Sequence, residues 1–183
     1  MTLTREQQQQ QPPQQRTEQR VCADCSSPAV GWASVNRCVL LCSDCAFVHR
    51  MLGRHVSDVK ALADADWIDC RLRLVYELSA SGANSVWEHA LLDCRKAAAK
   101  SAKEPTPQDS VALRDKFIRA KYESLAFVNR PSDDGQEELS QQLHASCRTA
   151  NLKVSLRLLA AGADPNFVSV PLLPFPLLPL HSC

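Results

Sequence analysis

Four cysteines in two closely spaced pairs constrain the fold of this 183-residue chain more than any other feature. Each pair has the pattern Cys-x2-Cys, sixteen residues separate the pairs, and the members are Cys22, Cys25, Cys42 and Cys45. Each pair can place two thiolates on one side of a metal ion, and two pairs complete the tetrahedron that zinc prefers. Four thiolates leave no position open for water, so we expect one structural zinc ion rather than a catalytic one. Four ordinary core cysteines are the weaker alternative at this spacing.

The other cysteines do not repeat the paired pattern, and the total of nine is odd. The first 20 residues contain no apolar signal-peptide core. We therefore expect reduced thiols and a cytoplasmic location rather than a disulfide scaffold. Cys38 is interpreted as a packed strand thiol between the two pairs, and no metal role is assigned to Cys70, Cys94, Cys147 or Cys183.

Charge composition argues against a dedicated nucleic-acid-binding protein. Lys and Arg total 21 and Asp and Glu total 20, a net charge of +1, whereas nucleic-acid binders usually carry a strong basic excess. Arg37 is the only basic residue between the two cysteine pairs. A zinc-ribbon nucleic-acid binder is therefore an alternative that the sequence does not favour, and no nucleic-acid partner is expected.

Composition and periodicity divide the chain into four parts. Residues 1–20 are a Gln-rich leader with little apolar surface to bury, so they are expected to be disordered. Residues 21–130 are expected to form the zinc domain, and residues 131–167 a helix pair. Residues 168–183 are rich in Pro and Leu and resemble no folded element. This apolar run is too short for a membrane span, and its prolines would break a helix.

The zinc domain is expected to have an α+β fold. The stretch Trp32 to Leu41 is rich in β-branched and apolar residues, which predicts one or two short strands. A helix from about Cys45 to Leu52 should follow, with Ser43 or Asp44 as its cap and Gly53 as its end.

Further helices are predicted downstream. Asp66 is expected to cap a second helix, Asn84 to begin a third with a capping-box arrangement, and Ser110 to begin a fourth. In the following part, helical spacing predicts a pair over about Leu139 to Ser146 and Leu152 to Ala160.

An arginine, Arg50, follows the last cysteine pair on the predicted helix. At 100° per residue, four apolar residues fall in one arc that should face the core: Phe47, Val48, Met51 and Leu52. Arg50 falls about 130° from the centre of that arc and should point toward solvent. On this geometry alone, a solvated charge is the ordinary interpretation.

Together these motifs resemble the ArfGAP family, the GTPase-activating proteins for Arf GTPases. The family pattern C-x2-C-x16-C-x2-C-x4-R is matched by the two cysteine pairs and Arg50. Further matching stretches are WAS (32–34), LGRHVSDVK (52–60), GANSVWEHALLD (82–93) and FIRAKYESLAFV (117–128). Within the family, VCADC, GWASVNR and the last two stretches resemble the GIT-type, receptor-kinase-interacting members. Residues 143–166 resemble an ankyrin unit.

The resemblance implies a fold, a partner and an activity. The fold is a small zinc-finger domain with four cysteine ligands and a short central sheet flanked by helices, followed by a partial ankyrin-like helical unit. Arg50 is implied to be an arginine finger supplied to a GTP-bound Arf-family GTPase, and Trp32 to position it or contact the GTPase. The protein would be an enzyme activator with no chemistry of its own, acting in vesicle trafficking and recruited to membranes through Arf. The basic loop Arg95 to Lys103 would meet an acidic membrane surface or remain solvated.

Two departures from the family pattern bear on activity. Most members have Gly where this chain has Cys38, and a side chain there costs about 1–2 kcal/mol if the position needs a positive φ. After GADPN the chain turns into VSVPLLPFPLLPL rather than further ankyrin repeats, so a truncated form is expected and the other protein partners of GIT-type members are in doubt. The alternative function is a catalytically silent interaction fragment.

Overall fold

The structure is a computed structural model that describes residues 20–92, 104–130 and 135–168. The predictions for the leader, for the loop Arg95 to Lys103 and for the Pro/Leu-rich tail fall outside these residues, except at Arg20 and Val168. The chain divides into two compact units, Met1–Phe127 and Val128–Cys183. Each unit is described by itself below.

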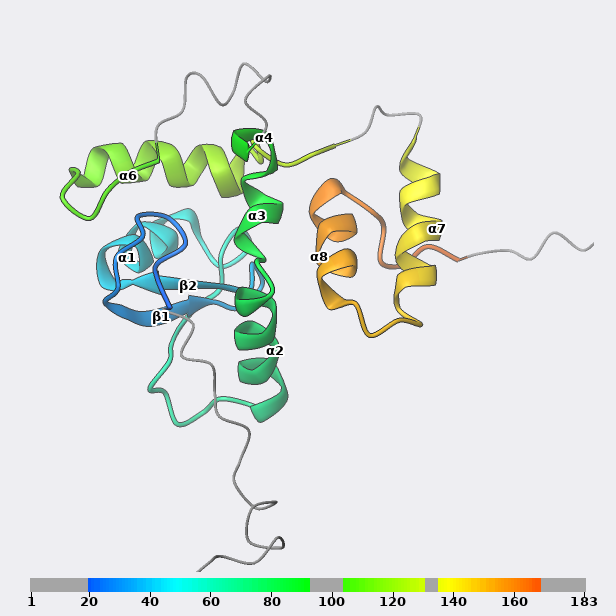
Figure 1. The fold of residues 1–183 in the computed structure, drawn as a ribbon, viewed down its shortest axis with the longest axis horizontal. Coiled ribbons are helices and arrows are strands. Elements are labelled where there is room, and N and C mark those ends of the chain that lie inside the picture. Colours follow the sequence, from blue (N-terminus) through cyan, green and yellow to red (C-terminus); the bar gives the residue numbers. More distant parts are fainter. Residues whose placement is uncertain (1–19, 93–103, 131–134, 169–183) are drawn as a thin grey trace, which may run out of the picture. The chain divides into compact units, whose positions relative to one another are not determined.

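The first unit is built on a three-stranded antiparallel sheet with strand order β2-β1-β3. Figure 1 labels the first two strands of this sheet. The strands are β1 (Val30–Ser34), β2 (Val39–Cys42) and β3 (Val59–Ala61). The first two lie where strands were predicted, and β3 was not predicted because its three residues carry too short a pattern to recognise. With its flanking helices, this sheet confirms the expected α+β fold.

Two helices cover opposite faces of the sheet: α1 (Ser43–Leu52) and α2 (Asp69–Ala80). Neighbouring side chains of a strand point to opposite faces, and β1 shows this clearly. Ala33 packs in an apolar cluster with Val75 of α2, whereas Trp32 contacts a side chain of α1. The helices α1 and α2 therefore pack on opposite faces of β1.

The described residues of the first unit also contain four short helical segments: α3 (Asn84–Trp87), α4 (His89–Leu92), α6 (Val111–Ile118) and the π-helical turn η1 (Arg119–Glu123). Helix α6 packs against α1 (Figure 1). It begins where predicted, because the Ser110 hydroxyl oxygen accepts a hydrogen bond from the backbone N–H of Leu113. Its continuation η1 brings Lys121 and Tyr122 into the core.

Three predicted capping arrangements are wrong. Neither Ser43 nor Asp44 caps α1, whose N-cap is the metal-facing residue Cys42. Helix α2 begins three residues after Asp66, because Asp66 donates its N–H to the Asp64 carboxylate in a separate turn. No side chain caps α3 at its start. The predicted end of α1 is confirmed, since Gly53 adopts φ +87 there.

Helix α1 buries a different face from the one predicted. Val48 and Leu52 are buried as expected, but the side chains of Phe47 and Met51 are 54% and 60% exposed. The buried face is completed by Cys45, Ala46 and His49. The prediction failed because it counted only apolar residues. A metal-directed cysteine and a buried histidine one turn later set the rotation of the helix instead.

The second unit is a helical hairpin formed by α7 (Gln136–Ser146) and α8 (Leu152–Ala161), as predicted. Asn151 caps α8 by accepting a hydrogen bond from the backbone N–H of Val154, and Gly162 ends it at φ +107. The hairpin core is small and contains Leu143, Leu158 and Ala163. Whether this unit is an ankyrin repeat stays a prediction.

None of the helices in the described residues has the length and apolar character needed to cross a bilayer.

Candidate metal centre and arginine site

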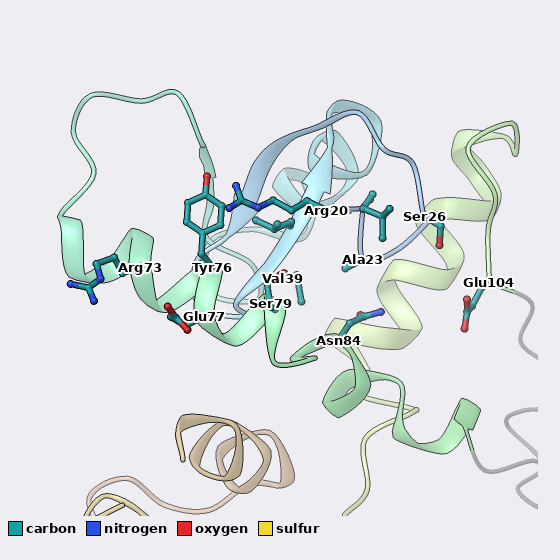
Figure 2. A pocket seen from close by; sticks show the side chains of 14 residues that line it. Arg20, Ala23, Ser26, Val39, Arg73, Tyr76, Glu77, Ser79, Asn84 and Glu104 are labelled. Atoms are coloured by element: carbon teal, nitrogen blue, oxygen red, sulfur yellow. The ribbon is translucent and has the colours of Figure 1, made fainter. Parts of the chain in front are cut away.

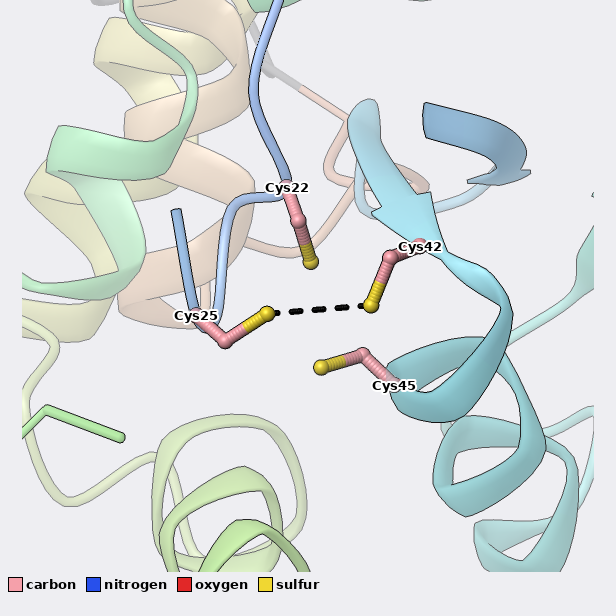
Figure 3. Close-up of side chains that lie close together, drawn as sticks. All are labelled: Cys22, Cys25, Cys42 and Cys45. Carbon is pink, nitrogen blue, oxygen red and sulfur yellow. Dashed lines mark hydrogen bonds between the residues drawn. The ribbon is translucent and has the colours of Figure 1, made fainter. Parts of the chain in front are cut away.

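The four predicted cysteine ligands come together in one buried cluster (Figure 3). Their four Sγ atoms all lie within 4.8 Å of one another, and each cysteine is buried. The Sγ atoms of Cys25 and Cys42 are 3.7 Å apart. A regular tetrahedron with Zn–S bonds of about 2.3 Å has edges of about 3.8 Å, so the sulfur positions fit a zinc ion. The cluster is a zinc-finger-like site for one structural Zn²⁺.

Two local turns present these sulfurs. In the first pair, the N–H of Ser26 donates to the carbonyl of Cys22 at 2.9 Å, which curls the chain so that both thiols face the same way. Ser26 adopts φ +58 to close this turn. In the second pair, Cys42 ends β2 and Cys45 lies in the first turn of α1. The metal therefore joins the N-terminal segment to the start of α1.

Proximity of the sulfurs favours ionisation of one of them. A hydrogen bond with the Cys45 thiol lowers the pKa of Cys22 to about 5 and correspondingly raises the pKa of Cys45. Such a cluster readily supplies a thiolate, the form in which cysteine binds zinc.

A buried polar network lies beside the metal cluster, and sequence reasoning missed it. The Asp24 carboxylate accepts hydrogen bonds from His49 Nε2 at 2.9 Å and from Lys121 Nζ at 2.9 Å. Lys121 also donates to Glu88 at 2.5 Å, and His49 Nδ1 lies 2.7 Å from the Ser57 hydroxyl. These side chains come from five separate segments. The network therefore ties the first zinc turn to α1, to the residue that follows α3, to η1 and to the loop before β3.

The charges in this network compensate one another. Burial favours the neutral carboxyl of Asp24, but the positive charge of Lys121 and the hydrogen bond from His49 outweigh it and hold its pKa below the usual range. Burial likewise disfavours charged Lys121, yet Asp24 and Glu88 together raise its pKa. The lysine thus stays charged although its side chain is completely buried.

Arg50 lies on the outward side of α1, where helical periodicity placed it. Its guanidinium carbon is 4.2 Å from the centroid of the Trp32 ring, a cation–π contact. Among the described residues Arg50 takes part in no salt bridge, so the guanidinium retains its charge for another ligand. The structure brings together the two residues singled out in the sequence, since the half-buried indole of Trp32 supports the arginine from β1.

A cavity of about 500 Å³ adjoins Arg50. Its lining includes four cations, Arg50, Arg54, Lys60 and Arg71, together with the exposed apolar residue Ile68. Arg54 and Lys60 are paired with carboxylates of the same lining, which moderates the positive charge. The guanidinium therefore lies at the edge of an open depression rather than on a flat surface.

A larger cavity, of about 640 Å³, is lined by the N-terminal segment and α2 (Figure 2). Arg20 stacks on the ring of Tyr76 at 4.2 Å, and Glu77 also lines the space. Two basic residues, Arg20 and Arg73, and two acidic ones, Glu77 and Glu104, line it, so no single ligand charge is favoured. Neither Arg50 nor Trp32 takes part in it.

Cys38 adopts a left-handed backbone conformation, with φ +55, in the turn between β1 and β2. Its thiol is buried and donates to the carbonyl oxygen of Val35 at 3.4 Å, and burial raises the pKa of this thiol to about 11. Because the φ of Cys38 is positive, the side chain at this position is expected to cost about 1–2 kcal/mol.

Comparison with known proteins agrees with this geometry. The family model described as "Putative GTPase activating protein for Arf" matches residues 7–131, more than half of the chain. The human ARF GTPase-activating protein GIT1 is 50% identical over 153 residues, 80% of this chain and 20% of that protein. The Drosophila melanogaster ARF GTPase-activating protein Git is 47% identical over 169 residues, and the Arabidopsis thaliana ADP-ribosylation factor GTPase-activating protein AGD4 is 33% identical over 156.

The chain spans about a fifth of the length of these curated relatives. Among solved structures, the solution structure of the ArfGap domain of human RIP shares the fold with a TM-score of 0.50. It is 19% identical in sequence, and the match covers 63% of this chain and 80% of that one. The zinc cluster, the fold and the family match agree: the chain belongs to the ArfGAP family and resembles its GIT-type members.

Proposed function

We propose that this protein activates GTP hydrolysis by a small GTPase of the Arf family and that Arg50 is its arginine finger. The observation that carries the proposal is an outward-facing guanidinium without a salt bridge among the described residues, stacked on Trp32 and carried by the helix that begins at the metal cluster. The names of the relatives support the same partner class.

The proposed mechanism rests on charge. Hydrolysis of GTP spreads negative charge over the transferring phosphoryl group and the leaving oxygens. A guanidinium is planar, permanently charged and forked, so it can donate two hydrogen bonds to these oxygens at once. The GTPase retains the nucleotide, its magnesium ion and the attacking water. This chain supplies a cation and a docking surface, and such a cation in trans is worth about 10³–10⁵ in rate.

The scaffold around Arg50 limits the freedom of the guanidinium before the GTPase arrives. Bound zinc contributes no chemistry to the reaction and serves to hold the first turn of α1. At the other end of the helix, the buried His49 fixes the backbone next to Arg50 through its bonds to Asp24 and Ser57. Trp32 offers an aromatic face that holds the charged group without neutralising it. Such preorganisation lowers the entropic cost of reaching the transition state.

A catalytically silent interaction fragment is the second candidate, and the left-handed conformation of Cys38 favours it. Strain in the turn between β1 and β2 would lower the stability of β1, which carries Trp32, although Trp32 contacts Arg50 with Cys38 in place. The two candidates share a fold and a partner and differ in whether hydrolysis is accelerated.

The test is single-turnover hydrolysis of GTP by a myristoylated Arf-family GTPase on lipid vesicles, with the zinc-loaded protein in excess. We expect an increase in the rate constant of at least about 10³-fold. A Rho-family GTPase serves as the specificity control and should show no increase. No acceleration by the wild-type protein, together with acceleration by Cys38→Gly, would support the silent candidate.

A further inference from the structure

The outward face of α1 exposes two large apolar side chains, Phe47 and Met51. Half of the helix is exposed, and its residues fall on one arc: Ser43, Asp44, Phe47, Arg50 and Met51. Phe47 lies at the centre of this arc, and Met51 follows one turn later, so the two side chains are neighbours. Among the Phe residues that the structure describes, Phe47 is the one with an exposed side chain. A pair of large apolar groups on one turn indicates a contact site rather than a scattered exposure.

This apolar pair lies directly beside Arg50. Residues three and four apart on a helix have Cβ atoms about 5–6 Å from one another, which places Phe47 and Arg50 side by side. Arg50 can stabilise charge on a nucleotide only if the GTPase approaches to hydrogen-bonding distance of its guanidinium. A protein surface that comes so close to Arg50 can extend over the neighbouring turn of the same helix. Phe47 and Met51 are therefore placed to contact a GTPase that docks at Arg50.

The remaining charge on this face fits the same occupant. Asp44 would repel an anionic nucleotide, but it forms a salt bridge with Arg114 of α6 at 2.8 Å. The face thus presents one free cation next to an apolar pair. Phe, Met and Arg are enriched in the cores of protein–protein interfaces, where a few such residues carry most of the binding energy.

A membrane surface is the competing occupant, and the helix does not suit it. Helices that lie on bilayers carry several Lys or Arg residues along the polar face and extend over many residues. Helix α1 has ten residues and presents one arginine, and its histidine is buried. A protein partner is therefore favoured over a lipid one.

We propose that Phe47 and Met51 form the apolar docking contact for the GTP-bound GTPase, with Arg50 as the adjoining catalytic group. This inference rests on the proposed function and adds to it the surface that determines affinity. The partner surface is expected to be apolar and to border the bound nucleotide. Affinity and rate are then carried by neighbouring but separate side chains of one helix.

The test compares the double variant Phe47→Ser/Met51→Ser with Leu74→Ser. Leu74 is an apolar side chain with 37% exposure on α2, the helix on the opposite face of the sheet, so it provides a matched control. Binding to an unmyristoylated Arf-family GTPase loaded with a non-hydrolysable GTP analogue is measured by calorimetry without lipid. Zinc content and melting temperature are checked in all three proteins. Single-turnover hydrolysis is then followed as a function of the concentration of each protein.

We expect the double variant to raise the dissociation constant about tenfold, with an unchanged rate constant at saturation, and the Leu74 variant to match the wild type. Equal dissociation constants for wild type and double variant, or no binding by either, would overturn the docking contact. An effect of the double variant seen only with vesicles would also overturn it, in favour of a lipid contact. A third outcome separates the two proposals. If the wild-type protein binds the GTPase without accelerating hydrolysis, and the double variant binds more weakly, the docking contact is supported and the proposed function is refuted.

Discussion

The clustering of the four cysteines could be predicted from the sequence because cysteine spacing determines which thiols share a metal. Arg50 is exposed as predicted, but that prediction was measured from a core face that included Phe47 and Met51, which are themselves exposed. The support of Arg50 by Trp32 could not be predicted from periodicity, because it depends on how β1 lies against α1. The resemblance to a known family suggested Trp32 without showing this contact. Asp24 and Lys121 could not be paired in advance, since 97 positions separate them in the sequence.

At Trp32, the aromatic face should matter more than the bulk. We expect Trp32→Leu to lower the saturating rate constant of GTP hydrolysis about fivefold, because a leucine cannot hold the guanidinium by cation–π attraction. Trp32→Phe keeps an aromatic face and should lose less than half of that effect. Single-turnover kinetics on both variants, matched for zinc content, checks this. Equal rate constants for the Leu and Phe variants would exclude the positioning role.

Because the backbone at Cys38 is left-handed, a protein with glycine at this position should be more stable than one with alanine. We expect Cys38→Gly to have a free energy of unfolding about 1 kcal/mol higher than Cys38→Ala, because both lose the thiol but only alanine retains a Cβ at φ +55. Urea unfolding of the two variants with zinc present measures the difference. A more stable alanine variant would show that the turn tolerates a side chain without strain.

At the scale of elements, α1 shows how polar groups override apolar periodicity. The predicted core face included Phe47 and Met51, yet the helix is rotated so that Cys45 meets the metal and His49 meets Asp24. Helix boundaries were predicted well where a local stop existed, as at Gly53. The predicted start of α2 was wrong, because Asp66 donates its N–H to the carboxylate of Asp64 in a turn that precedes the helix. Metal and buried hydrogen bonds therefore determine the orientation of the element that carries Arg50.

The lysine at the centre of the buried network should be essential for the stability of this arrangement. We expect Lys121→Met to lower the free energy of unfolding by about 3–5 kcal/mol, because it leaves the carboxylates of Asp24 and Glu88 buried without a cation. Arg54→Met removes one partner of an exposed pair with Asp58 and should cost less than about 1 kcal/mol. Denaturant unfolding followed by circular dichroism compares them. Similar costs for the two variants would mean that the network does not hold the elements together.

At the scale of the whole molecule, the chain combines a metal-centred unit with a small helical hairpin. Helix periodicity was sufficient to predict the hairpin helices. The three-stranded sheet was only partly predictable, because β3 is defined by its pairing with β1. The zinc cluster and the polar network beside it join segments of the first unit that are far apart in the sequence. The free energy of metal binding is therefore expected to contribute strongly to the stability of this unit.

Removal of zinc should unfold the first unit. All three tryptophans, Trp32, Trp67 and Trp87, lie in this unit, so their fluorescence reports on it. We expect a strong chelator to shift tryptophan emission toward the value in denaturant and added zinc to restore it, whereas chelator saturated with zinc should have no effect. Unchanged emission after complete loss of the metal would contradict a structural role for zinc.

The central claim is that Arg50 acts as a catalytic group in trans, and the most direct test is Arg50→Lys. Single-turnover GTP hydrolysis by an Arf-family GTPase should be measured at saturating concentrations of wild type and variant, together with their affinities for the GTPase and their zinc content. Lysine keeps the charge but lacks the fork, so we predict a fall in the rate constant of at least about 10²-fold with affinity and zinc content nearly unchanged. A variant that accelerates hydrolysis as well as the wild type would contradict the arginine-finger mechanism.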